Sequence, residues 1–387
     1  MPQELRVGVA GLGSVAAQIL PSFRDLPGVR LGGAADVRPE ARDDFTKTFD
    51  LPAFGTVEAM CRSKDIDVIW IATPNTAHCE HVIAAAENGK HAICEKPMAI
   101  SLAQCDAMIA AAEKNGVRLL QGHSKVFDAP VRAMREVVAS GRIGRVIQVN
   151  TWNFNDWLQR PRLASEVDTR LGGGLVYRQG PHMVDVVRYV AGGLAKSVRA
   201  VAGRHDPHFD TEGNFSALIE FEGGAVATLG FNGYGFFDVT ELTWGIGEGG
   251  QQRDDPRSKK PKPRRTGPME AEEKYRYAGG AAQREIYVRG ERMPFFGLTI
   301  VSGERGVIRQ SPDGLYLYTD TGCEEIRFSR GAGRAAELIE LRDALAAGRP
   351  VFPDGIWGRA TLEVCLGILD SSREHREITL SRQVPSR

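Results

Sequence analysis

Short apolar runs alternate with helical stretches between residues 5 and 121. The runs predicted to form buried strands are Leu5–Ala10, Val29–Ala35, Asp67–Thr73, His91–Cys94 and Val117–Gln121. Asn75 or Thr76 is expected to cap the helix after the third run, and Ser101 with Gln104 forms a capping-box pattern before a later helix. Because strands that alternate with helices pair in parallel through right-handed crossovers, this region predicts a doubly wound parallel sheet.

From residue 123 onward the pattern changes to closely spaced strand-like segments. Helices are predicted at Val131–Ser140, Arg334–Ala347 and Trp357–Glu374. The predicted strands are Arg145–Asn155, Ala195–Arg204, Phe215–Phe221, Val226–Phe231, Leu298–Ser302, Gly306–Gln310, Gly314–Thr319 and Glu324–Ser329. This density favours an α+β domain with a large, mainly antiparallel sheet and helices on one face. We therefore expect an α/β domain over residues 1–122 and an α+β domain over residues 123–387.

Composition narrows the possible functions. The 387-residue chain is 42% hydrophobic and 25% charged, as is ordinary for a globular enzyme. Its formal net charge is zero, so no overall field favours nucleic acid or a membrane surface, and no apolar run reaches the roughly 20 residues that span a bilayer. The six cysteines form no C-x-x-C pair, which favours reduced side chains in a cytoplasmic protein. No metal site is expected, because the histidines stand in no zinc-ligand pattern.

Residues 247–292 form a polar insert in the second predicted domain. Its segment from Arg253 to Arg265 is basic and contains prolines, but it has no interleaved aromatic residues. A solvated loop is therefore a better interpretation than a nucleic-acid-binding patch. A lid that steers an anionic substrate is the alternative.

The glycine-rich segment Gly11-Leu12-Gly13-Ser14-Val15-Ala16 lies between the first strand and the first helix. Gly11 permits a tight turn, Gly13 lets the backbone approach a pyrophosphate, and Ala16 lets the helix pack closely. Asp36, at the end of the second strand, can accept bonds from both ribose hydroxyls of NAD, although it could also be an ordinary strand-end polar residue. Arg38 could face the 2′-phosphate of NADP, so NAD is favoured and NADP stays possible.

Two polar segments follow later strands of the predicted parallel sheet. One is Thr73-Pro74-Asn75 with His78, and the other is Glu95-Lys96-Pro97. Ligands of such sheets bind beyond the carboxyl ends of the strands. We therefore expect both segments to lie near the nicotinamide end of the cofactor.

These motifs together resemble the Gfo/Idh/MocA oxidoreductase family, named after glucose–fructose oxidoreductase, inositol dehydrogenase and the rhizopine protein MocA. The matching residues are Gly11, Gly13 and Ala16, Ala72 to Asn75 with His78, Gly89-Lys90-His91, Glu95-Lys96-Pro97, and the glycine run that leads to His182. The resemblance implies a Rossmann domain, a homodimer or homotetramer through the open face of the second sheet, and Lys96 at the reacting alcohol with His182 beside it. A lysine in a dry pocket beside a cationic nicotinamide and a histidine can both serve as a base near neutral pH, so the choice between them stays open.

Arg178 stands where many members of this family carry an aspartate that binds sugar hydroxyls. A guanidinium there, four residues before His182, favours an anionic substrate, because arginine binds a carboxylate through two parallel hydrogen bonds. The stretch Tyr-Arg-Gln-Gly-x-His also resembles the phthalate 4,5-cis-dihydrodiol dehydrogenases within the family. The resemblance implies oxidation of a carboxylated cyclic diol, best 4,5-dihydro-4,5-dihydroxyphthalate, in the breakdown of aromatic compounds.

Other residues are expected around the substrate. His123, Trp157 and Arg160 are candidates to contact it, with Arg162 as a further one, while Asp185 could orient His182 or merely cap a turn. Alternatively, Arg178 forms only a structural ion pair and the chain oxidises a sugar, inositol or another polyol. A third interpretation is an NAD-sensing regulator without turnover, which the presence of both Glu95-Lys96-Pro97 and His182 disfavours.

Overall fold

The computed structural model describes residues 4–255, 257, 263–270 and 290–387. Their contacts divide the chain into two compact units. The first unit holds residues 4–123 and Ala332–Arg359. The second holds the described residues of 124–269, residues 290–331 and Ala360–Arg387.

The first unit is built on a six-stranded sheet whose strands are all parallel, in the order β3-β2-β1-β4-β5-β6. Its strands are β1 (Leu5–Ala10), β2 (Val29–Ala35), β3 (Ala53–Phe54), β4 (Val68–Ile71), β5 (His91–Glu95) and β6 (Leu119–Gly122). The central strands are buried on both faces: Val9 and Trp70 on one face and Ile69 and Cys94 on the other are all fully buried. This double burial is why the strands form near-continuous apolar runs, and the predicted Rossmann architecture is confirmed.

The helices of this unit begin largely where the sequence placed them. They are α1 (Ala16–Ile19), η1 (Leu20–Phe23), α2 (Pro39–Phe49), α3 (Val57–Cys61), η2 (Asn75–Ala77), α4 (His78–Glu87), α5 (Leu102–Lys114), α10 (Ala335–Ala346) and the first turn of α11 (Gly355–Glu374). The Ser101 hydroxyl accepts the Gln104 N–H at 3.3 Å, as predicted for a cap. The expected cap by Asn75 or Thr76 is wrong, because those residues form a 3₁₀ turn and α4 starts after Ala77 without a side-chain cap.

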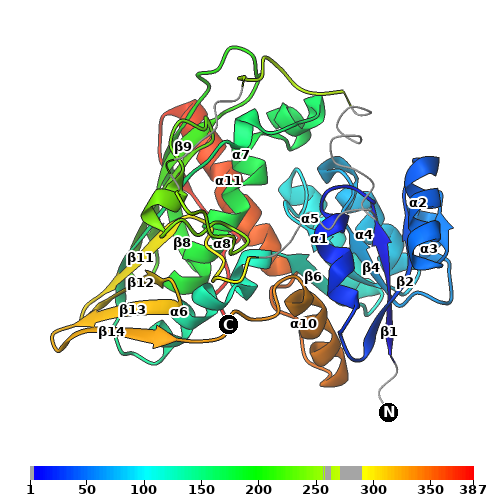
Figure 1. Cartoon of the computed structure of the whole chain (residues 1–387), viewed down its shortest axis with the longest axis horizontal. Coiled ribbons are helices and arrows are strands. Elements are labelled where there is room, and N and C mark those ends of the chain that lie inside the picture. Colours follow the sequence, from blue (N-terminus) through cyan, green and yellow to red (C-terminus); the bar gives the residue numbers. More distant parts are fainter. Residues whose placement is uncertain (1–3, 256, 258–262, 271–289) are drawn as a thin grey trace. The chain divides into compact units, whose positions relative to one another are not determined.

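Helix α10 packs on the Rossmann sheet, although the sequence placed it in the second domain (Figure 1). Its buried residues Leu338, Leu341 and Ala344 join the same core cluster as Val7 and Trp70. The helix therefore covers apolar surface that the helices of the first 123 residues leave open. The position of α10 along the chain does not indicate that it packs on the first sheet.

The second unit contains a nine-stranded sheet in the order β14-β13-β12-β11-β7-β10-β9-β8-β15. The strands are β7 (Val146–Phe154), β8 (Ala195–Gly203), β9 (Asn214–Phe221), β10 (Val226–Asn232), β11 (Leu298–Gly303), β12 (Val307–Ser311), β13 (Gly314–Thr319), β14 (Gly322–Arg327) and β15 (Ile378–Thr379). Strands β7 and β10 pair in parallel, and the other pairs are antiparallel. The predicted mainly antiparallel sheet is confirmed.

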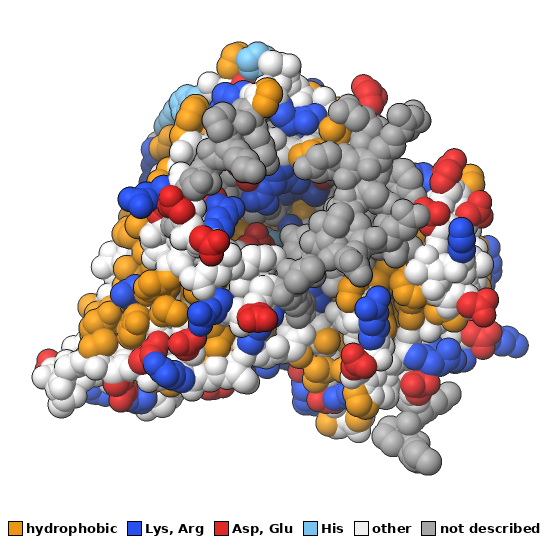
Figure 2. Space-filling model, in the orientation of Figure 1, with side chains coloured by type: hydrophobic (Ala, Val, Ile, Leu, Met, Phe, Trp, Pro, Cys, Tyr) orange, Lys and Arg blue, Asp and Glu red, His pale blue; other side chains and the backbone are white. Residues whose placement is uncertain are grey.

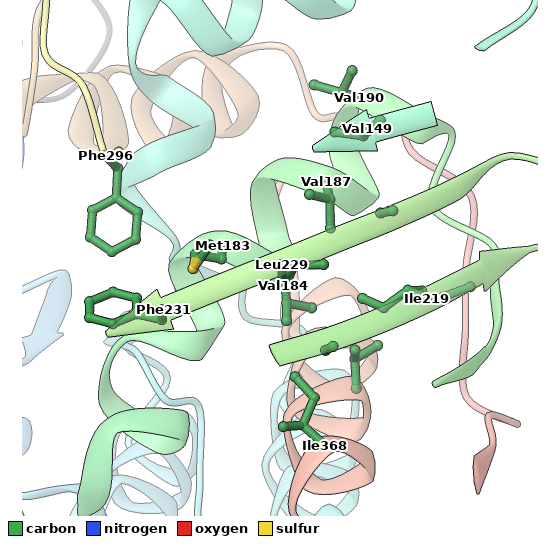
Figure 3. Close-up of a cluster of buried hydrophobic side chains, with 14 of the residues drawn as sticks. Val149, Met183, Val184, Val187, Val190, Ile219, Leu229, Phe231, Phe296 and Ile368 are labelled. Carbon is green, nitrogen blue, oxygen red and sulfur yellow. The ribbon is translucent and has the colours of Figure 1, made fainter. Parts of the chain in front are cut away.

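The two faces of this sheet differ in burial, as the alternation along each strand requires. Residues directly opposite one another on the packed face are buried throughout: Val198, Ile219, Ala227, Val149, Val301, Ile308 and Leu317. Helices α6 (Ala129–Ala139), α7 (Gly174–Arg178), α8 (Gly180–Ala191) and the rest of α11 supply the other half of this core. Figure 3 shows Val184 and Val187 of α8 with Ile368 of α11 beside the strands.

Short 3₁₀ turns join these elements: η3 (Ser124–Phe127), η4 (Trp157–Gln159), η5 (Ala164–Val167), η6 (Thr169–Leu171) and η7 (Val239–Leu242). On the opposite face of the sheet several large apolar side chains stay exposed, including Val201, Leu218 and Ile147. Figure 2 shows further hydrophobic side chains at the surface around strands β11–β14. A subunit interface on the open face stays a prediction. Among the described residues, no helix is both long and apolar enough to span a membrane.

Candidate active site

The glycine-rich turn follows β1 in the first unit. Gly11 has a φ of +91°, and a Cβ on it would lie 2.7 Å from the Ala72 carbonyl oxygen, so only glycine fits. A Cβ on Gly13 would meet nothing within 4 Å. The backbone at Gly13 is therefore bare, which is the condition for a pyrophosphate to approach it.

Asp36 at the end of β2 is tied to that turn and to Arg38. Its Oδ2 accepts the Leu12 N–H and an Arg38 guanidinium N–H, both at 2.8 Å, and its Oδ1 accepts the Arg38 backbone N–H and Nε–H, both at 2.9 Å. Burial alone would raise the pKa of Asp36, but the bonds from Arg38 and Leu12 outweigh it and lower the pKa. The carboxylate therefore stays ionised. Ribose hydroxyls can bind it only by replacing Arg38 as donor.

His78 joins the two segments that were predicted to lie near the nicotinamide. Its Nδ1 lies 2.9 Å from the Pro97 carbonyl oxygen and its Nε2 lies 3.0 Å from the Thr73 carbonyl oxygen. The side chain is only 1% exposed, and burial lowers the pKa of His78. Its contacts in this structure are thus to the backbone of the loops that follow β4 and β5. A direct contact between His78 and the cofactor stays a prediction.

Lys96 follows the last residue of β5 and is partly buried. The preceding Glu95 is buried, and its Oε1 accepts the Trp70 indole N–H at 3.2 Å and pairs with Arg334. Arg334 lies 239 residues further along the chain, and the sequence analysis missed it. No motif surrounds Arg334, so no signal could have found it. His123, a predicted substrate contact, follows β6 and is only 1% exposed.

In the second unit, the glycine run before α7 is required by close packing. Gly174 has a φ of +82°, and a Cβ on it would clash with Thr211 and Glu212. The Glu212 carboxylate accepts the Val176 N–H at 2.8 Å in the first turn of α7. The glycines thus let α7 pack against this buried carboxylate, which fixes the helix that ends at Arg178.

Arg178 forms an ion pair with Glu166 at 2.9 Å. The other oxygen of Glu166 accepts the Leu163 N–H at 2.7 Å, and the side chains of Arg178 and Glu166 are 23% and 11% exposed. A structural ion pair is the predicted alternative to substrate binding by Arg178. The structure contains that pair, so Arg178 does not present a bare guanidinium.

Arg162 lies in the same charged group and has a different environment. Its guanidinium stacks 4.6 Å from the centre of the Trp157 ring, and its Nε–H donates to the Trp157 carbonyl at 3.3 Å. Burial lowers the pKa of Arg162 to about 9, and the charge of Arg178 contributes. Among the described residues it forms no ion pair, although the carboxylates of Glu166 and Asp156 and the guanidinium of Arg160 act on it electrostatically. We define Arg162, Arg178 and Glu166 as the arginine cluster, which holds two cations and one carboxylate.

Two other predicted substrate contacts have different surroundings. Trp157 is fully buried and its ring contacts the Arg162 guanidinium, while its contact with substrate stays a prediction. Arg160 pairs with Asp156 at 2.8 Å, and its side chain is 44% exposed. The sequence could not separate Arg160 from Arg162, because both follow the same tryptophan.

His182 lies in the first turn of α8 and is 6% exposed. Its ring centre is 4.8 Å from that of Phe296, and the Lys125 ammonium lies 5.5 Å from the same Phe296 ring. Asp185, one turn further along α8, is fully buried and acts electrostatically on Arg188. The orientation of His182 by Asp185 stays a prediction.

Only part of the basic insert lies within the described residues. There, Arg253 pairs with Asp238 at 2.7 Å, and the Arg265 N–H donates to the Gln159 side chain at 2.8 Å. Residues 256, 258–262 and 271–289 lie outside the described part, so the lid hypothesis stays untested. No group of three metal-ligating side chains occurs in the residues that the structure covers.

Comparison with known proteins agrees with this architecture. Residues 5–123 match the model of an oxidoreductase family with an NAD-binding Rossmann fold, and residues 131–235 match the Gfo/Idh/MocA C-terminal domain. The chain is 32% identical over 377 residues to the 1-carboxy-3-chloro-3,4-dihydroxycyclohexa-1,5-diene dehydrogenase of Comamonas testosteroni, with 95% of each chain covered. The chain belongs to the Gfo/Idh/MocA oxidoreductase family. It is therefore an NAD-binding oxidoreductase, and the predicted family and cofactor are confirmed.

Other relatives act on different molecules. A 1,5-anhydro-D-fructose reductase of Ensifer adhaerens is 32% identical over 183 residues, covering 44% of this chain and 52% of its own. Among solved structures, a protein of Bordetella bronchiseptica RB50 described as a dehydrogenase is 35% identical with a TM-score of 0.88, over 97% of this chain and 100% of its own. An Agrobacterium radiobacter oxidoreductase in complex with NAD+, L-tartaric acid and magnesium is 18% identical with a TM-score of 0.75, over 97% and 98%, and supports the fold alone.

Proposed function

We propose that this enzyme uses NAD to oxidise a carboxylated cyclic cis-diol to the corresponding catechol carboxylate. The best candidate substrate is 4,5-dihydro-4,5-dihydroxyphthalate, which carries two carboxylates. The proposal depends on one observation above all: Arg178 pairs with Glu166 and Arg160 pairs with Asp156, so these two carboxylates act on Arg162 beside two other guanidiniums, and cations outnumber carboxylates by one.

An excess positive charge in a partly buried position needs a counter-ion. Burial already lowers the pKa of Arg162, which means that the protein does not fully offset the cost of burying this cation. A substrate carboxylate would supply the missing charge and could accept two N–H donors from one guanidinium. The hydroxyls of a neutral sugar would leave that charge uncompensated.

The relative in Comamonas testosteroni supports the same substrate class. Its name describes a cyclohexadiene diol with one carboxyl group, and the alignment extends over 95% of this chain. The chain also carries the Glu95-Lys96-Pro97 segment and His182, which are expected to serve the reacting hydroxyl.

Proton transfer and substrate binding are assigned to different residues. Lys96 or His182 takes the proton of the reacting hydroxyl. NAD, when bound, accepts the hydride that leaves the same carbon. The ring ketone then tautomerises: the neighbouring sp3 carbon, which bears the second hydroxyl, loses its proton and the carbonyl oxygen gains one. The product is the aromatic catechol, so aromaticity drives the reaction forward. Arg162 and Arg178 bind and orient the carboxylate and do not take part in proton transfer.

Turnover of defined substrates tests this proposal. The enzyme is incubated with NAD and, separately, with the phthalate dihydrodiol, a monocarboxylated cis-dihydrodiol, an uncarboxylated cis-dihydrodiol, myo-inositol and glucose, and NADH is followed by absorbance. We expect turnover of the carboxylated diols. Brisk oxidation of myo-inositol or glucose without oxidation of either carboxylated diol would reject the proposal in favour of a polyol dehydrogenase, in which the Arg178–Glu166 pair is purely structural.

The regulator hypothesis has its own discriminating result. A protein that binds NAD but oxidises none of these alcohols would support a sensor without turnover. Loss of turnover in Lys96→Ala with unchanged NAD binding would support an enzyme.

A further inference from the structure

The carboxylate of Glu95, next to Lys96, is held by side chains that lie far from it in the sequence. Its Oε1 accepts the indole N–H of Trp70 and pairs with the guanidinium of Arg334, and that guanidinium lies 5.2 Å from the centre of the Trp70 ring. The side chains of Arg334 and Glu95 are only 11% and 8% exposed. In such a dry position an ion pair holds its geometry far better than it would on the surface.

Arg334 serves a second carboxylate as well. It begins helix α10, and Glu337 in the first turn of that helix lies 3.3 Å from its guanidinium with no exposed side-chain surface. One cation therefore faces two buried carboxylates. Removing its charge would leave Glu95 and Glu337 as neighbouring buried anions, which is a costly arrangement.

The residue on the other side of Lys96 is also fixed. The carbonyl oxygen of Pro97 lies 2.9 Å from Nδ1 of the buried His78. Lys96 thus stands between a side-chain anchor at Glu95 and a backbone anchor at Pro97. Of these two anchors, only the one at Glu95 carries charge.

We propose that Arg334 is a positioning residue for Lys96, acting through Glu95: it fixes the end of β5 and offsets the carboxylate next to the lysine. This inference rests on the proposed role of Lys96 at the reacting hydroxyl. An uncompensated carboxylate beside an amine stabilises the ammonium form and so weakens the amine as a base. When Arg334 pairs with Glu95, the Glu95 carboxylate stabilises the ammonium form of Lys96 less.

Two further titratable groups interact electrostatically with Glu95, His78 of α4 and Cys94 of β5, and neither replaces Arg334. Burial lowers the pKa of His78 and raises the pKa of the Cys94 thiol, so both groups are neutral near pH 7. Arg334 is therefore the cation that the described part of the structure places against Glu95.

The test measures the lysine directly and needs no substrate. Full-length enzyme saturated with NAD is labelled briefly with acetic anhydride at a series of pH values, and acetylation of Lys96 is quantified by mass spectrometry. In Arg334→Met we expect the pH of half-maximal labelling to rise by about one unit, because the bared carboxylate stabilises the ammonium. Arg342→Met is the matched control: Arg342 lies on the same helix and donates to the Pro27 carbonyl at 2.7 Å, and its loss should leave the midpoint unchanged.

Two further variants keep the result decisive if Arg334→Met does not fold. Glu95→Gln removes the carboxylate and should lower the labelling midpoint, whereas Arg334→Lys retains the charge and should leave it near that of the wild type. Equal midpoints in the wild type, Glu95→Gln and every folded Arg334 variant would overturn the inference and leave Arg334 a purely structural residue. Because no alcohol is present, failure of the wild type to oxidise dihydrodiols would reject the proposed function without affecting this outcome.

Discussion

The two charged groups of this molecule have opposite imbalances. Beside Lys96 in the first unit, the guanidinium of Arg334 faces the carboxylates of Glu95 and Glu337. In the arginine cluster of the second unit, the carboxylate of Glu166 pairs with Arg178 and also acts on Arg162, on which Arg160 and Asp156 act as a further pair. An excess of negative charge suits a region predicted to lie near a cationic nicotinamide, and an excess of positive charge suits a carboxylated substrate. The contrast shows that the ratio of cations to carboxylates in a buried group is more informative than the presence of an ion pair.

The largest effect should come from replacing Lys96, the residue that Arg334 is proposed to position through Glu95. Lys96→Ala is expected to lower kcat by about 1000-fold, since a positioned general base contributes on the order of 100- to 10,000-fold. NAD affinity, measured by isothermal titration, should change little. A kcat within threefold of the wild type would leave His182 as the base.

Removing the charge of Arg162 from the arginine cluster should weaken substrate binding. Arg162→Met is expected to raise the KM for a carboxylated diol about 10- to 100-fold, because a charge-assisted hydrogen bond contributes roughly 1.5–3 kcal/mol. The KM for an uncarboxylated diol should stay within about twofold. Arg160→Met is the control, since Arg160 pairs with Asp156 and should show neither change.

The pair of Asp36 and Arg38 has one carboxylate and one cation, and variants of both residues extend the comparison to cofactor binding. Asp36→Ala should weaken NAD binding about tenfold, because the ribose loses its acceptor. Arg38→Ala should leave NAD binding unchanged or stronger, since Arg38 occupies both oxygens of Asp36. Dissociation constants for NAD and NADP measure both effects, and stronger NADP binding in Arg38→Ala would contradict the assignment.

The smallest expected effect is on stability, and it concerns the ion pair of Arg6 and Asp67. Arg6 lies at the end of β1 that is opposite to the glycine-rich turn. The side-chain bond from Arg6 lowers the pKa of Asp67. A carboxylate whose pKa is lowered by folding stabilises the protein above its unfolded pKa of about 3.9, and this contribution disappears as pH falls through the folded pKa. Asp67→Asn should therefore cost about 1 kcal/mol at pH 7 and nothing near pH 2, measured by denaturant unfolding. An equal cost at both pH values would show that packing, and not charge, is responsible.

The sequence predicted the strands and the glycine-rich turn, because their residue patterns recur in many proteins. Strands such as Leu5–Ala10 are buried on both faces, so their apolar runs alone located them. The cofactor turn was found because glycine is required where a Cβ would meet the backbone, as at Gly11. The start of α4 was missed because a 3₁₀ turn at Asn75–Ala77 precedes it, and spacing cannot distinguish that turn from a cap.

The charge partners could not be predicted, because each depends on tertiary contact. Arg178 and Glu166 are 12 residues apart, and Arg334 and Glu95 are 239 residues apart. Sequence pattern identified Arg178 as unusual for its family but could not show that a neighbouring acid holds it. Nor could it show that Arg162 stacks on Trp157 while Arg160 pairs with Asp156.

The central claim is that the arginine cluster selects a carboxylated ring, and the ratio of kcat/KM for a carboxylated to an uncarboxylated cis-dihydrodiol tests it most directly. The account predicts that this ratio is at least about 100 in the wild type and falls toward one in Arg162→Met/Arg178→Met. A wild-type ratio near one, unchanged in the double variant, would contradict the account.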